Sequence, residues 1–172
     1  MEKIKVIALV GKAGAGKDYL LRYYTDLFNG KVIVSCTTRP KREYEIEGKD
    51  YHFLSEEEFA AACFVEETEF NNWHYGTRYE DLDPDHVNVG VFNPAGIRAL
   101  ATNEDIELSV VYVKASAKTR LLRQLNREKD PNVYEIIRRF SADEADFQDD
   151  KDFTTLGKYF YYFWNDTEIG QE

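Results

Sequence analysis

The stretch Val6-Ile7-Ala8-Leu9-Val10-Gly11-Lys12-Ala13-Gly14-Ala15-Gly16-Lys17-Asp18-Tyr19-Leu20 decides how the rest of the chain folds. Its apolar run predicts a buried strand over 5–10, and the pattern after it predicts a helix over 18–28. The glycines between them let successive backbone N–H groups point into one concavity, beside a positively charged helix N-terminus. Strand, glycine turn and helix are the context of a phosphate-binding P-loop, in which Lys17 contacts the outer phosphates. The alternative is a glycine-rich turn without a ligand, which spacing, flanks and lysine together disfavour.

The position after Lys17 departs from the usual P-loop pattern. It normally carries Ser or Thr, whose hydroxyl binds magnesium, but here it is Asp18. A carboxylate is also a hard oxygen ligand, so Asp18 is a candidate for the magnesium site. It also adds negative charge beside the phosphates, which the metal has to offset.

Length and charge limit the class of protein. The 172 residues suggest one domain with a sizeable core, and a net charge of -10 argues against a general nucleic-acid-binding surface. The two cysteines, Cys36 and Cys63, lack metal-binding spacing and indicate free thiols in a reducing compartment. We find no signal peptide and no apolar run of membrane-spanning length. We therefore expect a cytoplasmic protein with no nucleic-acid or membrane partner.

Strand and helix patterns alternate along much of the chain, which predicts an α/β fold with a doubly wound, mainly parallel sheet and helices on both faces. Further strands are expected over 31–35, 87–92, 108–113 and 158–164, and further helices over 94–102 and 117–127. A last helix is expected to be capped by Asp130, with Pro131 at its first position.

The segment 44–83 interrupts this alternation. It contains a short strand over 51–54, a capping box in Ser55-Glu56-Glu57-Glu58 that opens a helix to Cys63, and extended segments 64–70 and 73–75 joined at Asn71-Asn72. We interpret it as a small mixed α/β lobe at the carboxyl ends of the core strands, where ligands of α/β proteins bind.

A second candidate phosphate site lies in Ser35-Cys36-Thr37-Thr38-Arg39-Pro40-Lys41-Arg42, where three cations occupy four positions. Arginine offers planar donor pairs that match phosphate oxygens, although alone the cluster could equally be a solvated turn. Because the chain already has a P-loop and is otherwise acidic, two phosphate sites suggest phosphoryl transfer between two substrates.

Ordered motifs extend this interpretation. The patterns Thr37-Thr38-Arg39-Pro40-x-Arg42, Gly48-Lys49-Asp50-Tyr51-x-Phe53, Ser55-x-x-Glu58-Phe59, Phe64-Val65-Glu66 and Tyr75-Gly76-Thr77 resemble the guanylate kinase family, and the resemblance spans about residues 4–166. It implies a nucleoside monophosphate kinase fold in one domain, 1–172. The implied core is 1–36, 85–116 and 150–172, with a GMP-binding lobe at about 37–84 and a helical lid at about 117–149.

The resemblance also implies roles for individual residues. ATP would contact Gly11, Ala13, Gly14, Ala15, Gly16, Lys17, Asp18 and Asn165. GMP would contact Ser35, Arg39, Arg42, Tyr51, Glu66, Tyr75, Thr77 and Asn93. Catalysis would rest on Lys17, Arg39, Arg127 and Arg139, with Arg138 as the alternative to Arg139 and with Arg123 either a lid arginine or a solvated helix charge. Magnesium would accompany ATP.

The implied role of Glu66 has a chemical reason. A carboxylate accepts hydrogen bonds from both the ring N1–H and the exocyclic amine of guanine, whereas adenine offers no such donor pair. Without the motif, the acidic run 66–69 would favour a surface acid at Glu66; the motif favours a ligand contact.

The chain departs from the family after its small lobe. The family usually has Asp-x-Asp before Gln-Gly, but here Val91 and Asn93 occupy the two acidic positions. Val91 cannot contact a hydrated magnesium ion, so Asp18 is a hypothetical replacement. The favoured function is transfer of the γ-phosphoryl of MgATP to GMP or dGMP by a monomer or homodimer. The alternatives are a weak or inactive guanylate-kinase-like binding module, or a kinase with shifted base specificity.

Overall fold

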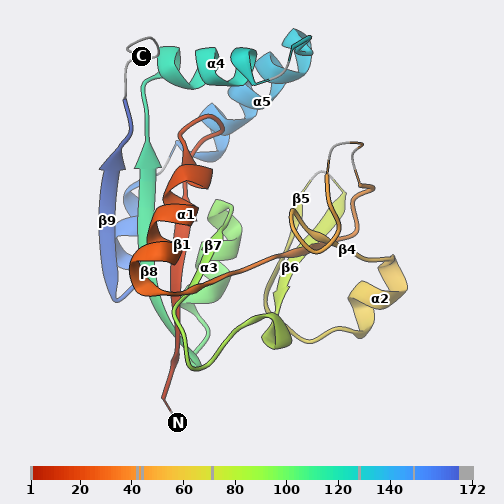
Figure 1. Cartoon of the computed structure of the whole chain (residues 1–172), viewed down its shortest axis with the longest axis vertical. Coiled ribbons are helices and arrows are strands. Elements are labelled where there is room, and N and C mark those ends of the chain that lie inside the picture. Colours follow the sequence, from red (N-terminus) through yellow and green to blue (C-terminus); the bar gives the residue numbers. More distant parts are fainter. Residues whose placement is uncertain are drawn as a thin grey trace.

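A five-stranded parallel sheet forms the centre of the protein (Figure 1), here a computed structural model that describes residues 2–41, 43, 45–70, 72–127, 129–148 and 150–166. The strand order is β2-β7-β1-β8-β9. The strands are β1 (Ile4–Val10), β2 (Lys31–Val32), β7 (Asn88–Val91), β8 (Ile106–Lys114) and β9 (Tyr159–Trp164). Every neighbouring pair is parallel, as the alternation of strands and helices predicts.

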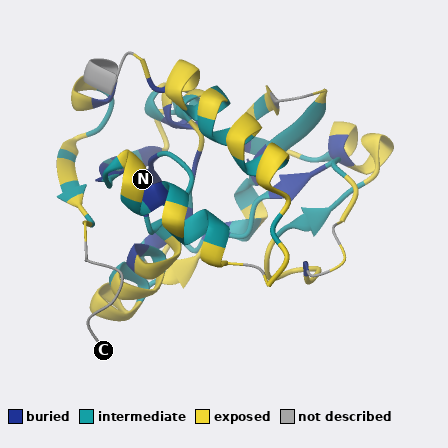
Figure 2. Cartoon of the chain, turned by 90° about the horizontal axis from the view of Figure 1, so that it is seen from above, coloured by how far each residue is buried: buried dark blue, intermediate teal, exposed yellow. Residues whose placement is uncertain are grey.

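Helices cover both faces of this sheet. Successive residues of β1 point to opposite sides, so Leu9 packs with Leu20 of α1 (Lys17–Phe28), whereas Ala8 packs with Ile97 of α3 (Pro94–Ala101). Figure 2 shows exposed residues along the outer faces of the helices and buried residues in the strands between them. The doubly wound α/β architecture is confirmed.

A second sheet forms the small lobe beside α3, in the order β4-β3-β6-β5 (Figure 1). Its elements are β3 (Cys36–Thr37), β4 (His52–Phe53), α2 (Glu56–Ala61), β5 (Phe64–Phe70), β6 (Trp73–Arg78) and the 3-10 turn η1 (Tyr79–Asp81). β3 and β4 are parallel and the other pairs are antiparallel, so the sheet is mixed as expected. The predicted capping box is present: the Glu58 N–H donates to the Ser55 hydroxyl, and the Ser55 N–H donates to the Glu58 carboxylate.

Two boundaries in this region differ from expectation. The strand predicted over 31–35 ends at Val32, because Cys36 and Thr37 pair with the small sheet rather than with the core. At the β5–β6 turn, Asn72 has a φ of 62°, a left-handed conformation that asparagine tolerates better than most residues. Asn71 lies outside the described residues.

The helices α4 (Ala117–Asn126) and α5 (Val133–Asp146) lie above the carboxyl ends of β1 and β8, followed by the 3-10 segment η2 (Asp150–Thr155). The expected cap of α5 is wrong: the helix begins after Asn132, whose side chain accepts the Glu135 N–H, rather than after Asp130. Both residue types cap helices well, and Asn132 is the one that lies three residues before Glu135. No helix in the described parts of the chain is long and apolar enough to cross a membrane.

Candidate active site

The loop between β1 and α1 surrounds the Lys17 ammonium and is contacted by side chains of α4 and of the segment after β9. Gly16 is the N-cap of α1 with a φ of 95°, and a Cβ there would overlap the side-chain amide of Asn165. Lys17 lies inside the loop, where its Nζ donates to the carbonyl oxygens of Gly11 at 2.6 Å and Lys12 at 3.2 Å. Burial lowers the pKa of the Lys17 ammonium, and the carboxylates of Asp143 and Asp18 oppose that shift.

Asn165 and Arg123 meet at this loop. Asn165 Nδ2 donates to the carbonyl oxygen of Ala15 at 3.0 Å. Arg123 donates to the carbonyl oxygens of Gly14 and Asn165, at 3.2 and 2.8 Å. Arg123 is therefore a structural link between α4, the P-loop and the end of β9, rather than a solvated helix charge. The predicted ATP-binding residues from 11 to 18 and at 165 are thus gathered in one place.

The other arginines predicted for the lid pair with carboxylates. Arg127 Nη2 lies 3.2 Å from Asp18 Oδ2, and both side chains are largely exposed. On α5, Arg138 and Arg139 share Glu135, with Nε to carboxylate distances of 2.8 and 2.7 Å. The hydrogen bond from Arg138, helped by that from Arg139, lowers the pKa of Glu135 to about 2, and burial opposes this shift. Arg127 thus contacts an expected ATP residue directly, whereas Arg139 contacts its own helix.

Two acids of α5 contact the P-loop, and no sequence pattern predicted these contacts. Asp143 Oδ2 accepts the backbone N–H of Ala13 at 2.5 Å. Glu144 accepts from Lys12 Nζ and from Arg120 Nη2, both at 2.6 Å. The Arg120 side chain is buried and its guanidinium stacks 4.5 Å from the Phe140 ring centroid. Charge patterning alone could not reveal the two contacts with the P-loop, because they join positions 130 and 132 residues apart.

In the small lobe, Glu66 is buried with 7% of its surface exposed and is paired with Thr77 across β5 and β6. Burial raises the pKa of the Glu66 carboxyl to about 7, although the Thr77 hydroxyl and N–H donate to it and partly oppose the shift. Ser35 Oγ lies 3.4 Å from Thr77 Oγ1, so three of the predicted GMP residues come together.

Glu66 also faces the core. Its Oε2 lies 3.1 Å from where a Cβ would stand on Gly96, in the first turn of α3. Asn93 caps this helix through a 2.7 Å hydrogen bond from Gly96 N–H, and its Nδ2 donates to Thr68 Oγ1 on β5 at 3.2 Å. The position where the family has an acid therefore links α3 to the strand that carries Glu66.

The remaining predicted GMP residues form an aromatic and charged cluster. Arg39 makes a two-pronged ion pair with Glu45, at 3.0 and 2.7 Å, and both side chains are mostly buried. Its guanidinium carbon lies 5.5 Å from the Tyr51 ring centroid, and the Tyr51 and Tyr75 rings are 6.0 Å apart. Sequence reasoning missed Glu45, which lies in a polar stretch without apolar periodicity. Arg42 lies outside the described residues.

The residues present suit a magnesium ion held mainly by a nucleotide. Within the described ranges, no three His, Cys, Asp or Glu side chains gather into a group that could hold a metal ion. Magnesium commonly keeps several waters and takes one or two carboxylates together with substrate phosphates. The exposed carboxylate of Asp18, beside the P-loop, fits that pattern.

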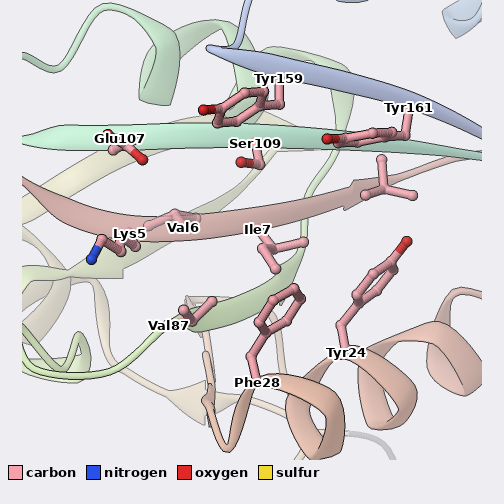
Figure 3. A pocket seen from close by; sticks show the side chains of 11 residues that line it. Lys5, Val6, Ile7, Tyr24, Phe28, Val87, Glu107, Ser109, Tyr159 and Tyr161 are labelled. Carbon is pink, nitrogen blue, oxygen red and sulfur yellow. The ribbon is translucent and has the colours of Figure 1, made fainter.

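A cavity of about 390 Å³ lies elsewhere, between α1 and the β1–β8–β9 face of the sheet (Figure 3). The Phe28 ring of α1 points toward Ile7, the Tyr24 ring points toward the side of Tyr161, and Tyr159 and Tyr161 lie on the opposite side of the cavity from α1. None of the predicted nucleotide-binding residues lines this cavity.

Comparisons with known proteins show which family the chain resembles. The family model described as guanylate kinase matches residues 3–157. Guanylate kinase of Thermotoga maritima is 32% identical over 172 residues, covering 91% of this chain and 80% of that protein. The human guanylate kinase is 30% identical over 158 residues, covering 85% and 79%.

A solved structure gives the same result for the fold. The crystal structure of guanylate kinase from Anaplasma phagocytophilum superposes with a TM-score of 0.62 at 20% identity, covering 96% of this chain and 79% of that one. With the family model matched over most of its length, this chain belongs to the guanylate kinase family.

Proposed function

We propose that the protein is a guanylate kinase, which transfers the γ-phosphoryl of MgATP to GMP or dGMP and releases ADP. The observation that carries the choice of acceptor is the buried Glu66 carboxylate, supported by Thr77 and Ser35. A buried acid is costly to ionise unless a partner supplies hydrogen-bond donors. Guanine supplies two such donors at adjacent positions, which makes it a fitting ligand.

The acceptor phosphate would lie beside Arg39, Tyr51 and Tyr75. Tyrosine hydroxyls donate to phosphate oxygens without adding charge, and an arginine guanidinium matches two oxygens at once. Arg39 is held by Glu45. That ion pair would fix the orientation of the guanidinium before GMP arrives, which supports binding by preorganisation.

The donor end would be formed by the P-loop, Lys17, Arg127 and Asn165. Phosphoryl transfer needs mainly positioning and neutralisation of charge on the transferring group, which Lys17 and the lid arginines would provide. Magnesium bound with ATP would neutralise part of the charge on its phosphates. Asp18 would be its protein ligand, and this requires Asp18 to exchange Arg127 for the metal. The core, GMP lobe and lid would then move relative to one another around the bound substrates.

One alternative has a specific observation behind it. Asp18 and Val91 replace two groups of the family's metal site, so a binding module that holds GMP without turnover is the second candidate. The retained glycines and Lys17 favour the enzyme, because a module without chemistry has no need of a triphosphate loop.

The test is an ADP-release assay with MgATP and a panel of nucleoside and deoxynucleoside monophosphates. Turnover confined to GMP and dGMP is the expected result. Turnover with monophosphates of other bases would still support a kinase, but it would refute the role of Glu66 in selecting guanine. Absence of turnover, with GMP binding detected by calorimetry, would favour the binding module instead.

A further inference from the structure

The helix α5 holds the P-loop through two neighbouring carboxylates that bind it in different ways. Glu144 binds the side chains of Lys12 and Arg120, which leaves the loop's backbone donors untouched. Asp143 instead accepts a backbone N–H, that of Ala13, at 2.5 Å. Backbone N–H groups are what a P-loop offers to phosphate oxygens, so Asp143 occupies a donor of the kind that a nucleotide uses.

The charge of Asp143 also acts on the centre of the loop. Among the charged groups that influence Lys17, Asp143 is the largest, ahead of Asp18. A negative charge at this position stabilises the empty, cationic loop, but it repels the triphosphate that Lys17 would bind. The charge of Asp143 therefore weakens nucleotide binding. This penalty disappears only if the carboxylate moves away or is neutralised.

We propose that Asp143 is a latch on the empty P-loop, and that ATP must displace its carboxylate from the Ala13 amide in order to bind. This inference rests on the proposed function, because it assumes that the loop binds ATP. In this exchange, a phosphate oxygen of ATP replaces the carboxylate oxygen of Asp143 as the acceptor on the loop. It couples entry of ATP to a shift of α5, which also carries Arg138 and Arg139. The latch weakens ATP binding and keeps the loop ordered while it is empty.

The test compares Asp143→Asn with wild type by calorimetric titration with magnesium and a non-hydrolysable ATP analogue. Asparagine retains an oxygen that can accept the Ala13 N–H but loses the charge. Roughly tenfold tighter binding is expected, the scale of one like-charge interaction in a partly solvated site. The Asp143→Ala variant removes the hydrogen bond as well as the charge, so it should bind the ATP analogue at least as tightly as Asp143→Asn does. Asp146→Asn is the matched control, since it makes the same charge change at an exposed position of the same helix.

The melting temperature is a second readout, which distinguishes the latch from a general effect of the substitution on folding. The melting temperature of empty Asp143→Asn should fall below that of wild type, while the increase produced by saturating nucleotide should be larger. Equal or weaker nucleotide binding by Asp143→Asn would overturn the latch, as would an equal gain in the Asp146→Asn control. The proposed function fails separately: if neither wild type nor Asp143→Asn binds the analogue, the ATP site itself is wrong and the latch falls with it.

Discussion

Replacing Glu66 by glutamine should stabilise the folded protein in a way that depends on pH. Burial raises the pKa of Glu66 from its ordinary 4.5 to about 7. At about 1.4 kcal/mol per pH unit, ionising it in the folded state costs about 3 kcal/mol more than in the unfolded chain. Between these pH values the native state retains a proton that the unfolded state has lost. The free energy of unfolding of the wild type therefore falls as pH rises from 4.5 to 7, and the cost is complete above pH 7.

Glutamine at position 66 has the same shape and does not titrate in this range. Its side-chain oxygen can still accept from Thr77, so the main change is removal of the buried charge. The stability difference between Glu66→Gln and wild type should therefore grow by about 2–3 kcal/mol between pH 5 and pH 8. For a chain of this length, that corresponds to an increase of roughly 5–10 °C in relative melting temperature. GMP binding should be lost in the same variant, because the guanine donors lose their charged acceptor.

The assay is urea unfolding of both proteins at pH 5, 6, 7 and 8, followed by tryptophan fluorescence. Glu67→Gln is the matched control, because Glu67 is the exposed neighbour on the same strand and should show a small difference that hardly changes with pH. A stability difference for Glu66→Gln that stays constant over this range would refute the argument. It would mean that Glu66 is either hydrated or ionised without cost in the folded protein.

Three further predictions concern ligand binding. Because the ionised form of Glu66 is the one that accepts both guanine donors, KM for GMP should rise below pH 7, by up to about tenfold per pH unit, and a pH-independent KM would contradict this. Asp18→Ala should raise the magnesium concentration needed for half-maximal turnover, and an unchanged requirement would remove Asp18 from the metal site. Gly16→Ala should weaken ATP binding by at least tenfold in calorimetry, because a Cβ at a φ of 95° is strained and overlaps the Asn165 amide. Gly48→Ala is the control for strain alone, because Gly48 also has a positive φ but a Cβ there would make only an ordinary 3.9 Å contact with His52 Cε1.

The architecture followed from patterns that are strong in single sequences. The apolar run before Gly11 and the β-branched run of β8 are buried central strands, whose patterns leave little ambiguity. The capping box at Ser55 was equally predictable, because its two hydrogen bonds are local. Element boundaries were less predictable. β2 ends at Val32 because Cys36 pairs with His52 and Gly76 in the small sheet, and no local sequence pattern indicates that pairing.

The same holds for the site: residues within local motifs could be predicted, whereas contacts between distant parts of the chain could not. The predicted ligand residues could be named because motifs preserve their order along the chain. Their counter-charges could not be named, since Glu45 lies in a stretch without periodicity and Asp143 lies on a helix whose orientation depends on the whole lid. A carboxylate in an acidic sequence carries no mark that distinguishes a solvated charge from a partner of a buried cation.

These counter-charges explain how an acidic protein can keep cationic sites for anions. With a net charge of -10, the chain has enough carboxylates to neutralise each expected phosphate site while it is empty. Arg39 binds Glu45, Arg127 binds Asp18, and the Ala13 amide binds Asp143. For the mostly buried Arg39, a cation without a partner would be strongly destabilising, so its pairing with Glu45 lets that site persist without ligand. Substrate binding then becomes an exchange of carboxylate for phosphate, and its net affinity is smaller than the contacts with phosphate alone would suggest.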